Sequence, residues 1–474
     1  MAETIDVDIC VVGAGASGLL VTAAAALLRR PVVLVEEAAM GGDCLNVGCV
    51  PSKALIAAAR AAADARRAGR FGILLNEPAV DYARVHDHVQ DVIAGIAPQD
   101  SAERYEGLGC RVIRAHGSFT GRGKLVAGDV TVRARRFVIA TGSRPSVPPV
   151  PGLAEMPYLT NETIFALATL PSHLVVIGGG PIGLELAQAY RRLGARVSVI
   201  EMAALLGNDD PEAADAVRGS VRRDGVELHE GAKLLGVERE GDGIAAIIEQ
   251  DGARNRIAGS HLLVAAGRKP TIDGLGLEAA GVSSSRKGIE TDQRLRTTNR
   301  RIYAVGDVTG RHLFTHVAGQ HAGIVIRNAL FRLPAKLDER AIPWVTYTDP
   351  ELAHVGLGEA AARAEHGPIR ILRGSFADND RARTERATAG FVKVIASRQG
   401  RVLGATIVGR HAGELIAPWA IAITRGIKLS ALAGLVLPYP TLGELNKSVA
   451  GSFYAPALFG ERARWLARWL AKLG

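Results

Sequence analysis

Cysteine is scarce in this sequence, with four residues among 474. Four cysteines cannot form a disulfide scaffold for a chain of this length, so we expect a protein of the reducing cytoplasm. Aromatic residues make up only 5% of the chain, and Ala, Val, Leu and Gly must therefore fill most of the core. No apolar run reaches the roughly 18 residues that a membrane span requires, and the opening MAETID is unlike a secretory signal peptide.

Positive charge is in excess, with a formal net charge of +9. Such a charge can attract nucleic acid, anionic lipid or anionic cofactors. The Lys and Arg residues are dispersed, however, and no basic stripe is interleaved with aromatic side chains. We therefore expect a solvated basic surface and no nucleic-acid partner.

Two glycine-rich segments repeat the same pattern along the chain. Each follows an expected buried strand, at residues 8–12 and 173–177, and each opens an expected helix that leads to a second strand ending in an acid. The first copy comprises Gly13, Gly15, Gly18 and Glu36, and the second comprises Gly178, Gly180, Gly183 and Glu201. In both copies the acid lies 23 residues after the first glycine.

This pattern is typical of dinucleotide binding. The first glycine makes a tight turn, the second lets the backbone approach a pyrophosphate, and the third lets the helix pack closely on the strand. The helix N-terminus attracts the phosphates, and the acid binds a ribose hydroxyl. The sequence therefore predicts two dinucleotide-binding modules.

A second repeat supports a duplication of this module. Residues 137–145 and 262–270 match one another, and each closes its module with a strand and a glycine turn. A further expected strand, 302–305, leads to Gly306-Asp307, where an acid at the strand end is placed to bind a sugar-like chain. We expect an α/β fold with two Rossmann-like modules, followed by an α+β C-terminal domain.

Two of the four cysteines, Cys44 and Cys49, lie close together in the segment GGDCLNVGCVPSK. The Pro-Ser-Lys that ends this segment opens an expected helix, so Cys49 lies near a helix N-terminus with Lys53 close by. Both features favour thiolate over thiol. Zinc takes four ligands, whereas Cys10 and Cys110 lie alone in expected strands. We therefore expect a redox-active pair and no metal site.

The cysteine segment resembles the active-site stretch of the class I pyridine nucleotide-disulfide oxidoreductases. That family includes dihydrolipoamide dehydrogenase, glutathione reductase and mercuric reductase. The first glycine motif resembles the family's FAD site, the second its NAD(P)H site, and Gly306-Asp307 its second FAD contact. The resemblance runs from about residue 5 to about residue 455. One departure is Asp43, which stands where the family usually has threonine.

The resemblance implies a role for each catalytic position. Cys44 would be the interchange thiol that attacks substrate, and Cys49 the thiol that stacks on the flavin and forms a charge-transfer complex. Lys53 would lie beside the flavin with Glu185 as its carboxylate partner. Hydride would pass from the nicotinamide to the flavin and then to the disulfide, so that Cys44 becomes free to reduce a small-molecule or protein disulfide.

The resemblance also implies a homodimer with FAD and a nicotinamide cofactor bound to separate domains. The expected domains are an FAD-binding domain at 1–148 and 272–341, an NAD-binding domain at 149–271, an interface domain at 342–460 and a basic amphipathic helix at 461–474. The expected FAD contacts are Gly13, Gly15, Gly18, Glu36, Gly42, Lys53, Thr141, Gly142, Gly306 and Asp307. The expected NAD contacts are Gly178, Gly180, Gly183, Glu201 and Gly267. Glu201 should repel a 2′-phosphate, and no arginine follows it in 202–206, so NADH is favoured over NADPH.

The C-terminal motif departs from the family pattern. Disulfide reductases of the family supply an acid/base from a His-Pro-Thr-x-x-Glu in the partner subunit, whereas this chain has Tyr439 at the first position and Glu444 at the last. Free histidine titrates near about 6.5 and tyrosine near about 10, so tyrosine is the poorer base near neutral pH. Oxidation of a dithiol is therefore disfavoured, and reduction of a disulfide or a soft metal is less affected.

Three functions stay open at this point. The first is a dihydrolipoamide-dehydrogenase-like disulfide reductase. The second is a metal or quinone reductase resembling mercuric reductase, which shares the tyrosine but also has a C-terminal cysteine pair, whereas the last cysteine here is Cys110. The third is a flavin redox sensor or electron-transfer protein at a membrane surface. For Tyr439 a tolerated substitution is the alternative, with water or Glu444 covering the role.

The C-terminal segment 462–473 has helical spacing, with one basic stripe and one stripe of Trp and Leu. A basic amphipathic helix with tryptophan suits the inner face of an anionic membrane. The alternative is that this helix packs on the dimer or on a partner protein.

Overall fold

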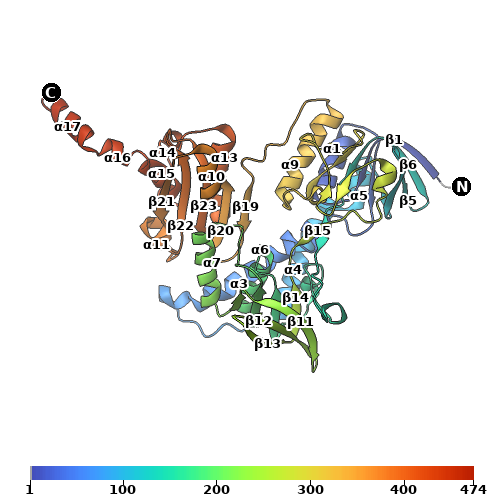
Figure 1. Ribbon diagram of the computed structural model, residues 1–474, viewed down its shortest axis with the longest axis horizontal. Coiled ribbons are helices and arrows are strands. Elements are labelled where there is room, and N and C mark those ends of the chain that lie inside the picture. Colours follow the sequence, from blue (N-terminus) through green and yellow to red (C-terminus); the bar gives the residue numbers. More distant parts are fainter. Residues whose placement is uncertain (1–2, 474) are drawn as a thin grey trace. The chain divides into compact units, whose positions relative to one another are not determined.

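The computed structural model describes residues 3–473, which fold as two compact units (Figure 1). The first unit contains the chain up to residue 202 and residues 227–337, and the second contains residues 203–226 and the chain from residue 338 onward. The mixed α/β fold expected from the sequence is confirmed. The four domain boundaries given above stay a prediction.

The first unit is built on a sheet in the order β3-β2-β1-β6-β5-β4, with β18 beside β6. Its strands are β1 (Glu3–Val12), β2 (Val32–Glu36), β3 (Arg111–Arg114), β4 (Gly117–Gly121), β5 (Lys124–Ala127), β6 (Val130–Ile139) and β18 (Ile302–Ala304). The β3, β2, β1, β6 and β18 strands run parallel, and β4 and β5 complete the sheet in antiparallel pairing.

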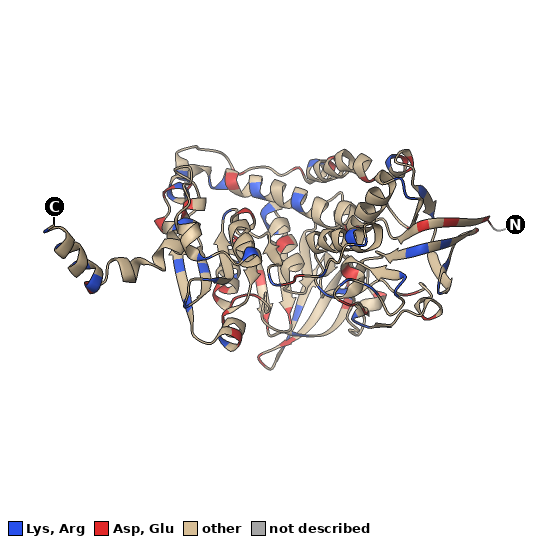
Figure 2. Cartoon of the chain, turned by 90° about the horizontal axis from the view of Figure 1, so that it is seen from above, with Lys and Arg blue, Asp and Glu red and all other residues tan. Residues whose placement is uncertain are grey.

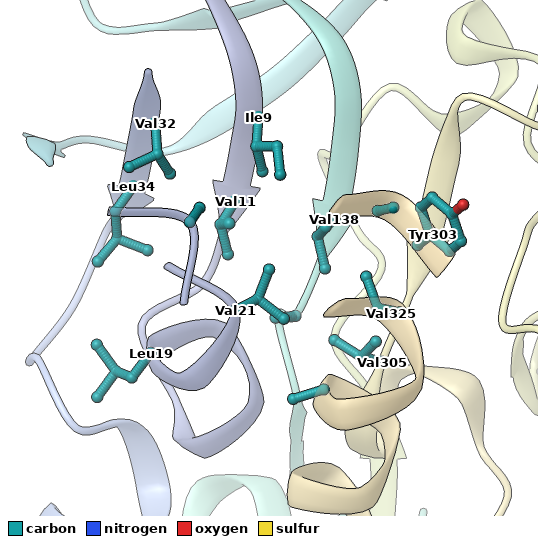
Figure 3. Close-up of a cluster of buried hydrophobic side chains, with 14 of the residues drawn as sticks. Ile9, Val11, Leu19, Val21, Val32, Leu34, Val138, Tyr303, Val305 and Val325 are labelled. Carbon is teal, nitrogen blue, oxygen red and sulfur yellow. The ribbon is translucent and has the colours of Figure 1, made fainter. Parts of the chain in front are cut away.

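Both faces of this sheet are buried around the second half of β1, which explains why its residues 9–12 are a continuous apolar run. Ile9 and Val11 of β1 point to one face, where they pack with Leu19 and Val21 of α1 (Ala16–Leu27) and Val325 of α9 (Thr315–Val325) (Figure 3). The alternate residues of β1 join a separate core on the other face. Because these strands run parallel, their carboxyl ends lie at the same edge of the sheet. The glycine turns follow at that edge.

A second parallel sheet, in the order β10-β9-β8-β14, carries the second glycine motif. Its strands are β8 (His173–Ile177), β9 (Arg196–Glu201), β10 (Glu227–Glu230) and β14 (His261–Val264), with α6 (Pro181–Leu193) between β8 and β9. An antiparallel sheet of β11 (Lys233–Glu240), β12 (Gly243–Gln250) and β13 (Ala253–Gly259) adjoins it. The two matching segments meet, because β7 (Ser143–Pro145) pairs with β15 (Arg268–Pro270).

The remaining elements of the first unit are helices and short strands. They are α2 (Gly42–Asn46), α3 (Cys49–Arg66), α4 (Tyr82–Ile96), α5 (Ala102–Gly107), α8 (Leu277–Ala280), β16 (Ser284–Ser285) and β17 (Gly288–Ile289). The long helix α3 packs against α6, which brings the cysteine segment to the second glycine motif's helix.

The second unit is an antiparallel sheet with helices, as expected from residue 342 onward. Its strands lie in the order β19 (Pro343–Thr346), β20 (Glu351–Gly356), β23 (Val402–Gly409), β22 (Phe391–Ser397) and β21 (Ile369–Ser375). Its helices are α7 (Pro211–Arg223), α10 (Glu359–His366), α11 (Asp380–Thr384), α12 (Ala412–Leu415), α13 (Ala417–Arg425), α14 (Leu429–Ala433), α15 (Gly443–Ser452), α16 (Ala455–Leu458) and α17 (Glu461–Leu470). The fully buried Trp419 and Phe376 anchor its core.

Lys and Arg residues are scattered over many elements (Figure 2), which fits the dispersed charge of the sequence. Over residues 3–473, none of the helices combines the length and the apolarity that crossing a bilayer needs.

Candidate active site

The first glycine motif forms the turn between β1 and α1. Gly13 has φ +105, and a Cβ on it would lie 2.4 Å from the Ala140 carbonyl oxygen. A Cβ on Gly18 would lie 1.9 Å from the Gly13 carbonyl oxygen, whereas a Cβ on Gly15 would meet nothing within 4 Å. The first and third glycines are therefore required by packing, and the second leaves the backbone open to a ligand.

The acid of this motif is already oriented toward the turn. Glu36, at the end of β2, accepts hydrogen bonds from the Ala14 N–H at 2.5 Å and the Ala38 N–H at 2.7 Å. Gly42 has φ +60, and a Cβ on it would lie 2.8 Å from the Gly15 Cα. The start of α2 thus packs against the open glycine, so the cradle fits a dinucleotide that spans from Glu36 toward the cysteine segment.

The second glycine motif repeats this geometry. A Cβ on Gly178 would lie 2.4 Å from the Ala265 carbonyl oxygen, and a Cβ on Gly183 would lie 2.0 Å from the Gly178 carbonyl oxygen. A Cβ on Gly180, as on Gly15, would have no atom within 4 Å. Glu201 accepts a hydrogen bond from the Gly179 N–H at 2.8 Å.

A cavity of about 540 Å³ lies at this second turn. Gly178, Gly180, Glu201, Gly267 and Arg268 are among the residues that line it, and four of these are the NAD contacts expected from the sequence. A cavity of this volume with a glycine turn and an acid suits a nucleotide.

The expected second FAD contact lies at the end of β18. Asp307 is half-buried and accepts a hydrogen bond from the Ser143 hydroxyl at 2.7 Å. Burial raises the pKa of the Asp307 carboxyl. Thr141 donates its hydroxyl hydrogen to the Thr271 carbonyl at 2.7 Å, and Gly142 has φ +69 with no atom within 4 Å of a Cβ. This edge therefore offers an acid and open backbone beside the first cradle.

The two cysteines lie in two consecutive helices. Cys44 lies in α2 and is half-buried, whereas Cys49 is the first residue of α3 and is exposed. Both are free thiols. The hydrogen bond from the Cys44 thiol, the Thr315 hydroxyl and the Lys53 charge lower the pKa of Cys49 to about 6. The same contact with Cys49, together with burial, raises the pKa of Cys44. Cys49 is therefore the thiolate of the reduced pair.

Lys53 and Glu185 meet, as the family resemblance implied. The Lys53 ammonium lies 2.8 Å from a Glu185 carboxylate oxygen, and Glu185 is almost fully buried. Burying a charged carboxylate costs free energy unless a cation or a hydrogen-bond donor lies beside it. The contact joins α3 to α6 and places a cation one helical turn after Cys49.

A network around Arg268 was not foreseen from the sequence. Arg268 donates to the Asp43 carboxylate, to the Ser143 hydroxyl at 2.8 Å and carbonyl at 2.7 Å, and to the Asn161 side chain at 3.3 Å. Asn161 in turn donates to the Val47 carbonyl at 3.1 Å. The charge of the unusual Asp43 is thus paired with that of Arg268. The segment that carries Cys44 is bound on both sides, by Arg268 at Asp43 and by Asn161 at Val47. The position of Arg268 directly after Gly267 was the signal available.

Tyr439 and Glu444 belong to the second unit. The Tyr439 side chain is 71% exposed, and its hydroxyl donates to the Asp380 carboxylate at 3.0 Å. Glu444 instead accepts from the Thr441 backbone N–H at 3.2 Å. The hydrogen bond to Asp380 raises the pKa of Tyr439. Tyr439 is therefore held as a phenol, and its partner is Asp380 rather than Glu444.

Comparison with known proteins places these features in one family. A family model described as pyridine nucleotide-disulphide oxidoreductase matches residues 7–322, and the model for its dimerisation domain matches residues 342–450. The chain is 39% identical over 459 residues to a mercuric reductase of Streptomyces lividans, covering 94% of this chain and 96% of that protein. It is 34% identical over 455 residues to a dihydrolipoyl dehydrogenase of Bacillus subtilis (strain 168), covering 94% and 96%.

Solved structures give the same result. The Cu(II) complex of the HOCl-induced flavoprotein disulfide reductase RclA from Escherichia coli matches with a TM-score of 0.85 and 26% identity, over 94% of this chain and 99% of that one. LpdA from Mycobacterium tuberculosis matches with a TM-score of 0.86 and 29% identity, over 94% and 99%.

Proposed function

Since the chain belongs to the pyridine nucleotide-disulphide oxidoreductase family, we propose that it is an NADH-dependent disulfide reductase that acts through Cys44 and Cys49. The family is FAD-dependent and uses a pyridine nucleotide, and its dimerisation domain indicates a homodimer. When bound, FAD supplies the transfer of two electrons from the reduced nicotinamide to the Cys44–Cys49 disulfide. The residues that would hold it are those of the first glycine cradle, with Lys53 and Asp307.

The reaction is balanced as NADH + H⁺ + RSSR giving NAD⁺ and two RSH. As Cys44 gives up its proton, its sulfur attacks one sulfur of the substrate disulfide, the S–S bond breaks, and the leaving thiolate takes that proton. The Cys49 thiolate then attacks the Cys44 sulfur, which forms the Cys44–Cys49 disulfide and releases the second thiolate, and this thiolate takes a proton from solvent. Each step needs a thiolate nucleophile.

The observation that carries this proposal is the asymmetry of the two thiols. Cys49 is exposed at the N-terminus of α3, and its pKa of about 6 makes it a thiolate at neutral pH. Cys44, with its raised pKa, holds the shared proton. The Lys53 charge and the Thr315 hydroxyl both stabilise the thiolate of Cys49. Cys49 is therefore the sulfur that we expect to receive the electrons from the flavin.

The C-terminal motif supports the reducing direction. Because the pKa of Tyr439 is raised by Asp380, its hydroxyl does not serve as a base near neutral pH. Dithiol oxidation needs a base that removes a thiol proton, whereas disulfide reduction does not remove protons from substrate. Glu201, with Met202 after it at the cavity, supports NADH as the cofactor.

Reduction of a soft metal ion is the second candidate. Two relatives favour it by their printed names, the mercuric reductase of S. lividans and RclA with Cu(II). Thiolates are preferred ligands of soft metal ions. Within residues 3–473, no cluster of three His, Cys, Asp or Glu side chains is arranged to hold a metal, so the metal would meet the cysteine pair as a substrate.

A substrate panel with NADH tests the proposal. Lipoamide, oxidised glutathione, Hg(II) and a quinone are each given to the wild type, to Cys44→Ser, and to Cys110→Ala as a matched control in the core. We expect a disulfide to be reduced by the wild type and the control and not by Cys44→Ser. Reduction of Hg(II) alone would establish the second candidate, and quinone turnover that survives Cys44→Ser would contradict a thiol mechanism.

We also propose that α17 binds an anionic membrane surface. None of its residues is buried, and Trp465 and Trp469 are 66% and 49% exposed. Arg464 and Arg468 form a basic stripe beside the tryptophans, about 100° around the helix, and Lys472 follows just after the end of α17. Apolar and basic faces of this kind suit the boundary of anionic lipid.

Vesicle co-sedimentation tests the membrane proposal. The wild type should bind vesicles that contain phosphatidylglycerol, and binding should weaken with salt and be lost in a chain ending at Gly460. Neutralising Arg464, Arg468 and Lys472 to Gln should have the same effect, whereas the matched neutralisation of Lys233, Arg239 and Arg254 should not. Equal binding by the shortened chain would refute the proposal. It would also remove the main support for a redox sensor at a membrane.

A further inference from the structure

Two short segments of the second unit are fastened together around Tyr439. The Tyr439 hydroxyl donates to Asp380 at 3.0 Å, and the Asn379 side chain donates to the Thr441 carbonyl at 3.1 Å. Asn379 also caps α11 by accepting from the Ala382 N–H at 3.0 Å. The position of Asp380 is therefore fixed by its own helix start and by the Tyr439 turn.

The turn that carries Tyr439 is fixed independently. The Thr441 hydroxyl donates to the Pro438 carbonyl at 2.9 Å, and Glu444 accepts from the Thr441 N–H at 3.2 Å. The Glu444 carboxylate is thus hydrogen-bonded to the backbone. The carboxylate beside the phenol oxygen of Tyr439 is that of Asp380.

The Asp380 carboxylate is exposed, and no Lys, Arg or His among residues 3–473 forms an ion pair with it. The neighbouring cation Arg381 pairs with Glu385 at 2.5 Å instead. The Asp380 carboxylate therefore places an exposed negative charge 3.0 Å from the phenol oxygen of Tyr439. A substrate that approaches Tyr439 meets that charge.

From this arrangement we infer that Asp380 is a specificity-determining residue, which favours cationic over anionic electrophiles at the active site that Tyr439 completes. The inference rests on the proposed function and on the family pattern given above, in which the C-terminal motif of one subunit serves the cysteine pair of the other. A carboxylate in water at several ångströms changes the rate for a dication relative to a dianion by roughly five- to tenfold at low salt.

The first arm of the test compares two linear disulfides with the same S–S bond, cystamine, a dication, and dithiodiglycolate, a dianion. With NADH, the wild-type holoenzyme should reduce cystamine with the higher kcat/KM. Asp380→Asn should lower the ratio of the two values roughly five- to tenfold. Asp251→Asn, the same charge change at the exposed β12–β13 turn, should leave the ratio as it is, and added salt should lower it in the wild type.

The second arm does not require turnover. Reduced Cys49→Ser holoenzyme reacts at Cys44 with a cationic or an anionic methanethiosulfonate, in which the thiolate displaces sulfinate to form a mixed disulfide. Adding Asp380→Asn should lower the cationic-to-anionic rate ratio, whereas adding Tyr439→Phe, which keeps the carboxylate, should not. An unchanged ratio in Asp380→Asn overturns the inference. If the wild type reduces neither disulfide in the first arm, but Asp380→Asn lowers the rate ratio in the second arm, only the proposed reductase function is overturned.

Discussion

The hydroxyl of Thr315 lies 3.3 Å from the sulfur of Cys49. Thr315 begins α9 and Cys49 begins α3, so the contact joins the starts of two helices that are 266 residues apart. Either atom can donate when Cys49 is a thiol, but only the hydroxyl can donate once it is a thiolate. The contact therefore favours the charged form of the sulfur.

Replacing Thr315 with Val should raise the pKa of Cys49 above its value of about 6. The variant keeps the shape and removes one donor, and a hydrogen bond to a charged group is worth about one pKa unit or slightly more. The rate of iodoacetamide alkylation of the reduced holoenzyme reports the thiolate, which is present above the pKa and lost as the pH falls through it. The midpoint should move to higher pH in Thr315→Val and stay near its wild-type position in Thr315→Ser. Equal midpoints in all three proteins would contradict the assigned role.

Lys53 and Glu185 should shift the same pKa in opposite directions. The Lys53 charge lowers the pKa of Cys49, and the Glu185 charge raises it. Lys53→Met should therefore move the alkylation midpoint to higher pH, and Glu185→Gln should move it to lower pH, each by about one unit or less. Lys53→Arg keeps the charge and is the control. Shifts of the same sign in Lys53→Met and Glu185→Gln would show that packing, not charge, governs the sulfur.

The Asp43–Arg268 pair predicts an asymmetry in stability. Arg268→Ala leaves Asp43 and the half-buried Asp307 without the cation that lies near both, whereas Asp43→Asn leaves Arg268 bonded to Ser143 and Asn161. Because the Asp43 side chain is 43% exposed, solvent screens much of the pair. We expect a loss of about 1–3 kcal/mol for Arg268→Ala and less than about 1 kcal/mol for Asp43→Asn.

Urea unfolding of the FAD-saturated variants checks this asymmetry. The double variant should lose less stability than the sum of the two single losses, because the second change removes a group that has already lost its partner. Strict additivity would mean that the two side chains do not interact in solution.

The local parts of the fold and site could be predicted from sequence because their causes are local. Gly18 and Gly183 are required by a backbone contact within one strand–turn–helix unit, and Gly13 and Gly178 by the positive φ of the turn in that unit. Such a unit leaves a pattern of fixed spacing that one sequence can reveal. The meeting of Lys53 with Glu185, 132 residues apart, was instead predicted through the family resemblance.

The residues that were missed act across the fold. Thr315, Arg268 and Asp380 each contact a residue of the site from a distant element. No motif of fixed spacing surrounds Thr315 or Asp380, and the glycine turn before Arg268 does not indicate which side chains it contacts. Glu444 was expected as a catalytic residue of the C-terminal motif, and the structure gives it a backbone partner. Which carboxylate meets a given hydroxyl depends on how a turn packs against a helix start, which residue type alone does not determine.

The proposed preference for NADH rests on Glu201 and should be reversible. Its carboxylate is held by the Gly179 N–H at 2.8 Å beside the cavity, where it can bind a ribose 2′-hydroxyl and repel a 2′-phosphate. Glu201→Ala should lower kcat/KM for NADH by about tenfold, through loss of a charge-assisted hydrogen bond.

Met202 is 73% exposed, so an arginine there has room to reach a phosphate. Glu201→Ala with Met202→Arg should therefore favour NADPH, and Met202→Arg alone should not, because the Glu201 charge remains. Fluorescence titration with NAD⁺ and NADP⁺ gives the same comparison without turnover, and a wild type that binds NADP⁺ more tightly would show that Glu201 does not select the cofactor.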